Sequence, residues 1–219
     1  MRILGRLQDL LYPRKCVLCD KLLLKEETDL CAHCRINAPA FEGRCRSIPY
    51  VDGWTAVWFY EGQVRESLLR YKFRGRSCYA QAYGRILAAG IAERFQGEFD
   101  VLTYVPVSRR RNLRRGYDQV KLLAQAVARE LGCRNRKTLR KVRHNQAQST
   151  IPEADRRRAN VLGVYRVRHP GRIRGKRVLL LDDIMTTGAT VSECAKVLKL
   201  AGAERVLCAS LALARSGNR

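Results

Sequence analysis

The chain has 219 residues, of which 46% are hydrophobic, enough for one core-forming domain with a small appendage and too many for a disordered chain. No apolar run is long enough to span a membrane. Residues 1–13 also lack the apolar core of a secretory signal peptide, so a cytoplasmic protein is expected. Nine cysteines, an odd number, favour reduced thiols and a metal site over a disulfide framework.

The net charge of +23 is concentrated in one part of the chain. Residues 101–177 hold 22 Lys and Arg but only 4 Asp and Glu, which gives +18, whereas residues 1–100 carry +4 and residues 178–219 carry +1. A positive field favours polyanions such as pyrophosphate, nucleotides or nucleic acid. The alternative is a solvated basic surface, which the clustering disfavours.

Two C-x-x-C pairs stand near the N-terminus: Cys16 with Cys19, and Cys31 with Cys34, separated by eleven residues. Four thiolates in this spacing predict a closed, tetrahedral, structural Zn²⁺ site without an open position for catalysis. His33 is the alternative to Cys34 as the fourth ligand, and we favour Cys34. Because so short a segment buries little apolar surface, metal binding is expected to supply most of its folding energy.

Predicted strands and helices alternate through the middle of the chain. Trp54–Tyr60 has the β-branched and aromatic content of a strand, and a helix is expected over Arg65–Tyr71. Residues 71–76 then interleave aromatic and basic side chains. They either stack on and neutralise nucleic acid, or end the helix with the aromatic rings packed inward and the basic groups in solvent. A helix over about 78–95 and a strand over Val101–Val105 follow.

Arginines cluster after that strand, at Arg109, Arg110, Arg111, Arg114 and Arg115. Since Arg pairs with phosphate bidentately, this cluster predicts a pyrophosphate or polyanion site, with a basic surface loop as the alternative. A helix then runs to about Leu131.

Residues 140–160 are too polar for a core and long for a passive connection. They predict a mobile loop that covers a reactive sugar and brings charge to it. Val161–Val167 is then expected as a strand that leads toward Arg177.

The most informative stretch is 178–190, where four apolar residues run into Asp182 and Asp183. The apolar run predicts a buried parallel strand, and open α/β sheets bind ligands at the carboxyl ends of such strands. The two acids could bind the hydroxyls of a sugar diol, and the loop after them could bind a phosphate. Together they indicate a ribose 5-phosphate as the ligand. The alternative is an ordinary strand–turn–helix with the Asp pair as a helix cap. The phosphate would contact the backbone N–H groups and hydroxyls of the loop that opens the next helix, Thr186, Thr187, Gly188, Ala189 and Thr190.

A helix that ends at Gly202 and a last buried strand over Val206–Leu213 complete the pattern. The alternation of strands and helices predicts an α/β fold with a doubly wound, mostly parallel sheet.

Residues 178–190 resemble the signature of type I phosphoribosyltransferases, which bind phosphoribosyl pyrophosphate (PRPP). The resemblance implies a sheet of that type, Asp182 and Asp183 as the catalytic pair on the ribose hydroxyls, and Thr186–Thr190 on the 5′-phosphate. It also implies Mg²⁺ bound together with PRPP, and a homodimer. We therefore expect a zinc-binding knuckle with an N-terminal arm over residues 1–48, and a phosphoribosyltransferase-like domain over residues 49–219.

The whole order of motifs, from the cysteine knuckle through Val105–Ser108 and Arg115–Gln119 to the PRPP motif, resembles the ComF family over about 11–213. Many of its members carry Asn at the position of Asp118 and a second cysteine ribbon, of which only Cys45 remains here. The resemblance implies a competence-related protein that transfers phosphoribosyl to a nitrogen acceptor, with the DNA-uptake machinery and single-stranded DNA as partners. The alternative is a non-catalytic, single-stranded-DNA-binding competence factor that uses PRPP as a sensor or structural ligand.

Overall fold

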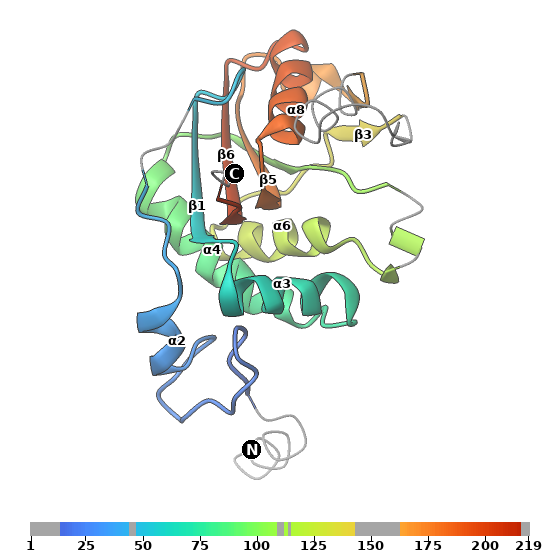
Figure 1. Cartoon of the computed structure of the whole chain (residues 1–219). Helices are drawn as coiled ribbons and strands as arrows, with labels where there is room; N and C mark the ends of the chain where they lie inside the picture. The colour runs from blue at the N-terminus through green and yellow to red at the C-terminus, as the bar shows by residue number, and fades with distance from the viewer. Residues whose placement is uncertain (1–13, 44–46, 109–111, 114, 143–162, 216–219) are drawn as a thin grey trace, which may run out of the picture.

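A four-stranded parallel sheet forms the centre of the molecule (Figure 1). The computed structural model describes residues 14–43, 47–108, 112–113, 115–142 and 163–215. Across the sheet the strands follow the order β1 (Gly53–Phe59), β6 (Arg205–Leu213), β5 (Arg177–Met185) and β2 (Val101–Tyr104). The strand that carries both acids, β5, is therefore internal, as its apolar run predicts.

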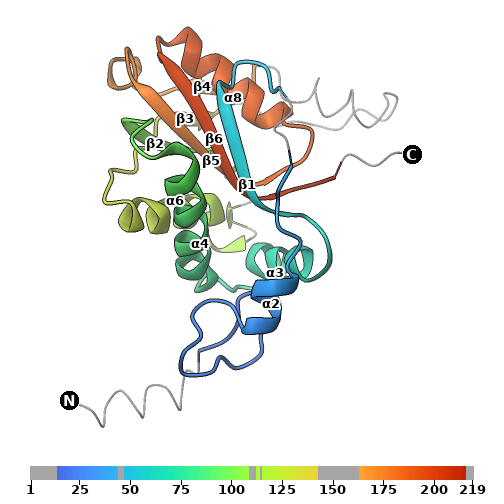
Figure 2. The same cartoon turned by 90° about the vertical axis from the view of Figure 1, so that its left-hand side faces the viewer.

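Helices cover both faces of this sheet (Figure 2). One face carries α4 (Tyr79–Phe95) and α6 (Gln119–Glu130), with α3 (Gly62–Phe73) packed into the same core cluster. The other face carries α8 (Ala189–Leu200). The predicted doubly wound α/β fold is confirmed.

Alternate residues of β5 supply the two cores. Leu179 and Leu181 pack with the helices of the first face, while Val178 and Leu180 pack with α8. Because both faces of the strand are covered, every residue from 178 to 181 must be apolar, which is why the strand reads as a continuous apolar run.

A second, two-stranded antiparallel sheet lies beside α8. It pairs β3 (Leu139–Lys141) with β4 (Tyr165–Val167), and the short 3₁₀ helix η1 (Pro170–Arg172) leads from β4 toward β5. The strand predicted over 161–167 is thus shorter than expected and pairs outside the main sheet, because Tyr165 and Leu139 bury their side chains in the α8 core. Most of the predicted loop over 140–160 lies outside the described residues.

The segment with the cysteine pairs, which ends in the short helix α2 (Ala32–Asn37), lies against α3 at one end of the molecule (Figure 1). Its buried side chains, among them Val17 and Leu18, belong to the same core cluster as α3 and α4. Within the described ranges, no helix has the length and apolar character needed to cross a membrane.

Candidate functional site

The two acids lie within β5 rather than beyond its end, because the strand continues to Met185. Asp182 pairs in register with Ser210 of β6, and both acids are almost fully buried, with exposed fractions of 8% for Asp182 and 5% for Asp183. Two adjacent carboxyl groups in a low-dielectric setting require compensating partners.

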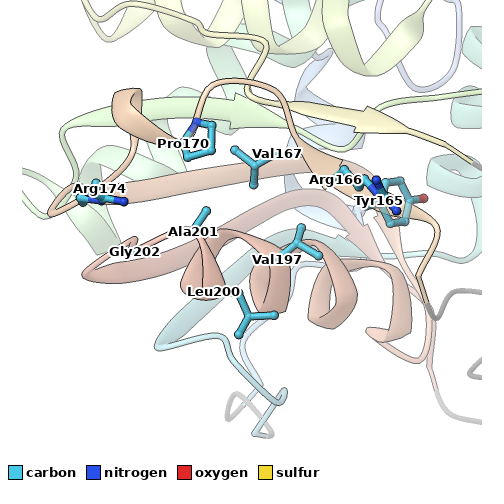
Figure 3. Close-up of a pocket in the computed structure, with 9 residues that line it drawn as sticks. All are labelled: Tyr165, Arg166, Val167, Pro170, Arg174, Val197, Leu200, Ala201 and Gly202. Carbon is cyan, nitrogen blue, oxygen red and sulfur yellow. The ribbon is translucent and has the colours of Figure 1, made fainter.

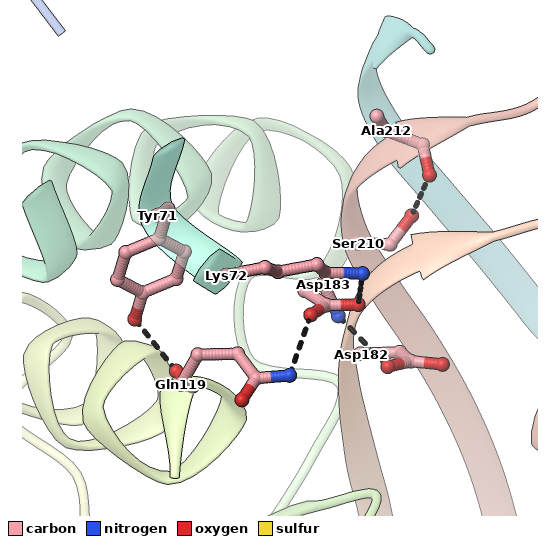
Figure 4. A network of polar contacts seen from close by, with 7 residues as sticks. All are labelled: Tyr71, Lys72, Gln119, Asp182, Asp183, Ser210 and Ala212. Carbon is pink, nitrogen blue, oxygen red and sulfur yellow. Dashed lines mark hydrogen bonds and ion pairs between the residues drawn. The ribbon is translucent and has the colours of Figure 1, made fainter. Parts of the chain in front are cut away.

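Asp183 receives its partners from two helices on one face of the sheet (Figure 4). Lys72 of α3 places its Nζ 2.9 Å from Asp183 Oδ1, and Gln119 of α6 donates from Nε2 to Asp183 Oδ2 at 3.2 Å. The backbone N–H of Asp183 in turn donates to Asp182 Oδ1 at 2.8 Å. Neither Lys72 nor Gln119 is a predicted site residue, although both stand in segments, 71–76 and 115–119, that the sequence marks as unusual.

The electrostatics of the pair are unequal. Burial, followed by the charge of Asp183, raises the pKa of Asp182 to about 8. The raised pKa favours the protonated form of Asp182, which donates a hydrogen bond, whereas Asp183 has an ammonium counter-ion and can accept one. A donor and an acceptor side by side suit the two hydroxyls of a vicinal diol.

The loop Thr186–Gly188 joins the end of β5, two residues beyond the acids, to the N-terminus of α8. Gly188 has a φ of +79°, which favours glycine, and a Cβ at this position would also crowd the Ile48 side chain at 3.1 Å. Thr187 Oγ1 accepts from Ala189 N at a long 3.4 Å. A helix N-terminus that begins at glycine and follows two acids offers its first-turn N–H groups to an anion.

Of the predicted arginine cluster, only Arg115 lies within the described residues, and nothing is placed for Arg109, Arg110, Arg111 and Arg114. The Arg115 guanidinium lies 4.8 Å from the centre of the ring of Phe73, the residue that follows Lys72 in the chain. Asp118 caps α6 by accepting from Lys121 N at 3.0 Å, a role that Asn could also fill.

The segment 71–76 ends α3 and follows the helix-end interpretation only in part. Tyr71 is fully buried and its hydroxyl donates to the Gln119 carbonyl at 2.6 Å, whereas Phe73 is 59% exposed. Lys72 is not in open solvent but paired with Asp183, so the segment contributes to the acidic pair.

The four cysteines of the two C-x-x-C pairs meet, with Sγ atoms all within 4.8 Å of one another. Cys19 and Cys31 Sγ lie 3.7 Å apart, close to the roughly 3.8 Å edge of a tetrahedron with Zn–S bonds of about 2.3 Å. Burial, with the other three sulfurs, raises the pKa of Cys34, a crowding that a divalent cation relieves. His33 instead contacts Asn37, at 3.3 Å from Nδ1 to Nδ2, so the donor set that fits zinc consists of the four cysteine thiolates.

A shallow hollow of about 480 Å³ lies between β4 and the C-terminal end of α8 (Figure 3). Val167, Pro170 and Ala201 form much of its apolar lining. It lies at the opposite end of α8 from Thr186–Gly188 and contains neither acid, so it is separate from the acidic pair.

Comparison with known proteins agrees with this arrangement. Residues 121–219 match the phosphoribosyl transferase domain family, and residues 7–49 match the double zinc ribbon domain family. Within the second match the described cysteines form one group of four, and Cys45 lies outside the described residues.

Among curated proteins, the chain is 32% identical to DNA utilization protein YhgH of Salmonella typhimurium, over 90% of both chains. It is 27% identical to Competence protein F of Haemophilus influenzae over 84% of both chains. A solved glutamine PRPP amidotransferase from B. subtilis superposes with a TM-score of 0.45 at 23% identity, over 65% of this chain and 30% of that chain.

The fold, the matched domains and the cysteine group together define a phosphoribosyltransferase-like protein with a zinc ribbon. More narrowly, the chain belongs to the ComF family, whose relatives are named for competence and DNA utilization.

Proposed function

We propose that the chain binds PRPP with Mg²⁺ at the β5–α8 loop and transfers its phosphoribosyl group to a nitrogen acceptor, in a cytoplasmic protein that serves DNA uptake. One observation carries the proposal: two adjacent buried acids near the end of β5 are separated by only five residues from the N-terminus of α8. That spacing suits a sugar whose diol and 5′-phosphate bind side by side. We further propose that residues 1–48 form the zinc knuckle and residues 49–219 the transferase-like domain.

In the proposed step, the bond from ribose C1 to the pyrophosphate oxygen breaks and a bond from C1 to the acceptor nitrogen forms. Asp182 and Asp183 orient the ribose through its hydroxyls, and the first-turn N–H groups of α8 hold the 5′-phosphate. Mg²⁺ bound together with PRPP would supply positive charge toward the departing pyrophosphate. Arg115, with Arg109, Arg110, Arg111 and Arg114, supplies further positive charge to that leaving group.

Calorimetric titration of the zinc-loaded protein with PRPP and Mg²⁺ tests this proposal. We expect saturable binding that is lost in Asp182→Ala/Asp183→Ala, because the sugar then has no hydroxyl partners in β5. Arg65→Ala, a change of an exposed residue on α3, is the matched control and should bind as the wild type does. Absence of binding to the wild type would contradict the proposal.

A second candidate function, single-stranded DNA binding with PRPP as a sensor or structural ligand, is favoured by the β3–β4 pair. Arg140 and Arg166 face each other across the two strands, and both are exposed. Directly opposed like charges destabilise a strand pair unless an anion lies between or over them. A polyanion on this surface would therefore relieve a repulsion that the free protein carries.

Charge reversal separates this candidate from the first. Arg140→Glu/Arg166→Glu should reduce by about two the number of counterions released when single-stranded DNA binds, and so weaken the salt dependence of binding. The PRPP affinity should stay unchanged. Arg35→Glu/Arg65→Glu changes the net charge equally at two other exposed arginines and should have the smaller effect on DNA binding. Equal loss in both variants would mean that net charge, not this surface, governs DNA binding.

A further inference from the structure

Helix α3 presents one stripe of side chains to the cysteine knuckle, at Gln63, Ser67 and Arg70, which are spaced four and three residues apart and so share one face. Ser67 Oγ donates to the Val17 carbonyl, and Arg70 Nη2 donates to the Leu18 carbonyl. Both carbonyls lie between Cys16 and Cys19, inside the first C-x-x-C pair.

The stripe also reaches a predicted zinc ligand. Gln63 lies with its Oε1 3.0 Å from Cys34 Sγ, which donates to it as a thiol. When Cys34 is a zinc-bound thiolate, the same amide turned over donates from Nε2 instead, a contact that commonly orients metal ligands. Three side chains of α3 thus depend on the knuckle being folded, and a knuckle of this size folds on its metal.

The last turn of the same helix reaches the acidic pair, directly after the stripe. Lys72 Nζ lies 2.9 Å from Asp183 Oδ1, and its side chain is only 16% exposed. Tyr71 holds this turn against α6, because its hydroxyl donates to the Gln119 carbonyl at 2.6 Å and its own carbonyl accepts from Tyr117. One helix therefore contacts the knuckle along its length. Its last turn contacts Asp183 through Lys72 (Figure 4).

We propose that Lys72 is a positioning residue for Asp183, and that the zinc-loaded knuckle sets the place of Lys72 through α3. The proposal rests on the proposed function in that Asp183 is one of the sugar-binding acids. An α3 released from the knuckle lets Lys72 leave Asp183, and a buried carboxylate without its counter-ion no longer offers a fixed acceptor to a ribose hydroxyl. The ammonium group has three donors, so those not used by Asp183 can contact oxygens of an anionic ligand.

Acylation of lysine amines, followed by mass spectrometry of the full-length zinc-loaded protein, measures the contact without any ligand. In Ser67→Ala/Arg70→Met, which leaves all four cysteines in place, Lys72 should be acylated at least about fivefold faster. A fivefold factor corresponds to the net free energy of one ordinary hydrogen bond. Lys199 of α8 is the internal control, since its 2.7 Å ion pair with Asp52 lies on the other face of the sheet and should keep its rate.

Withdrawal of zinc from the wild type with a chelator makes the same test with the sequence unchanged. Lys72 should again react faster while Lys199 does not. An unchanged rate at Lys72 in the zinc-free wild type, or in the double variant with one zinc still bound, overturns the proposal.

PRPP titration tests whether the contact between Lys72 and Asp183 contributes to ligand affinity. PRPP affinity should fall at least about fivefold in Ser67→Ala/Arg70→Met and in Lys72→Met, and Lys72→Arg should recover part of it because Arg keeps the charge. A merely structural lysine would show no such recovery. If the wild type binds no PRPP, the proposed function fails, yet the acylation rates still decide whether zinc positions Lys72.

Discussion

Asp182→Asn is expected to raise the free energy of unfolding by at least about 2 kcal/mol at pH 8, although it removes an acid of the proposed sugar site. Burial, then the charge of Asp183, raises the pKa of Asp182 from 3.8 to about 8. The folded protein must therefore keep a proton that the unfolded chain releases, or bury an uncompensated charge. Asn keeps the side-chain oxygen that accepts from Asp183 N and carries no proton to lose.

The sign of this effect follows from the pKa of Asp182, which is higher in the folded protein than in the unfolded chain. Below about pH 4 Asp182 is protonated in both states, so the wild type has no penalty. As the pH rises from about 4 to about 8, the unfolded chain ionises first, and the stability of the wild type relative to the variant falls. Above about 8 the difference stays constant.

Urea unfolding of both proteins at pH 5, 6.5 and 8, with zinc held constant, measures the difference and cancels the other titrating groups. Asp100→Asn is a useful contrast, because the Arg177 guanidinium holds the pKa of Asp100 low, at about 2, so this substitution should not stabilise. A wild-type-minus-variant difference that does not change with pH would show that Asp182 is ionised in the folded protein.

The parts of the fold that follow from local patterns were predictable. The apolar run at 178–181 must be a strand covered on both faces, and the loop after Asp183 must open a helix, because glycine at 188 and the small residues beside it allow that turn. The doubled C-x-x-C spacing likewise predicts four thiols around one ion, since each pair places two sulfurs on one side of a metal.

Contacts between segments that are distant in the chain were not predictable in the same way. Lys72 and Gln119 meet Asp183 from two helices that come much earlier in the chain, and a single sequence gives no measure of that proximity. The strand β4 is shorter than predicted and pairs with β3 outside the main sheet, because strand propensity does not say which partner a strand will pair with.

Gly84 shows how a residue of low helix propensity can be essential to packing. It lies in the middle of α4, buried, where the helix meets α6, and a Cβ built on it would stand 2.3 Å from Ala126 Cβ and 3.0 Å from the Ala126 carbonyl carbon. Side chains do not approach so closely, so the two helices must move apart. Gly84→Ala is therefore expected to destabilise the protein by about 1–3 kcal/mol, even though Ala favours a helix by about 1 kcal/mol.

Gly90, six residues further along the same helix, is the matched control. A Cβ there meets nothing within 4 Å in the described structure, so Gly90→Ala should stabilise by about 0.5–1 kcal/mol through helix propensity alone. Opposite signs for one substitution in one helix, read from thermal melts of the zinc-loaded protein, isolate packing from propensity. Two stabilising or two destabilising results would contradict the close approach of α4 and α6.

Ala126→Gly extends this test to the partner side chain. Alone it should destabilise by about 1 kcal/mol, because glycine is a poor helix former. Combined with Gly84→Ala it should recover most of the lost stability, since one Cβ then occupies the space between the helices from the other side. Such a non-additive pair is what direct contact produces, whereas two independent helix effects would simply add. The size of the coupling thus measures how firmly α6, whose first residue Gln119 donates to Asp183, is held in place by α4.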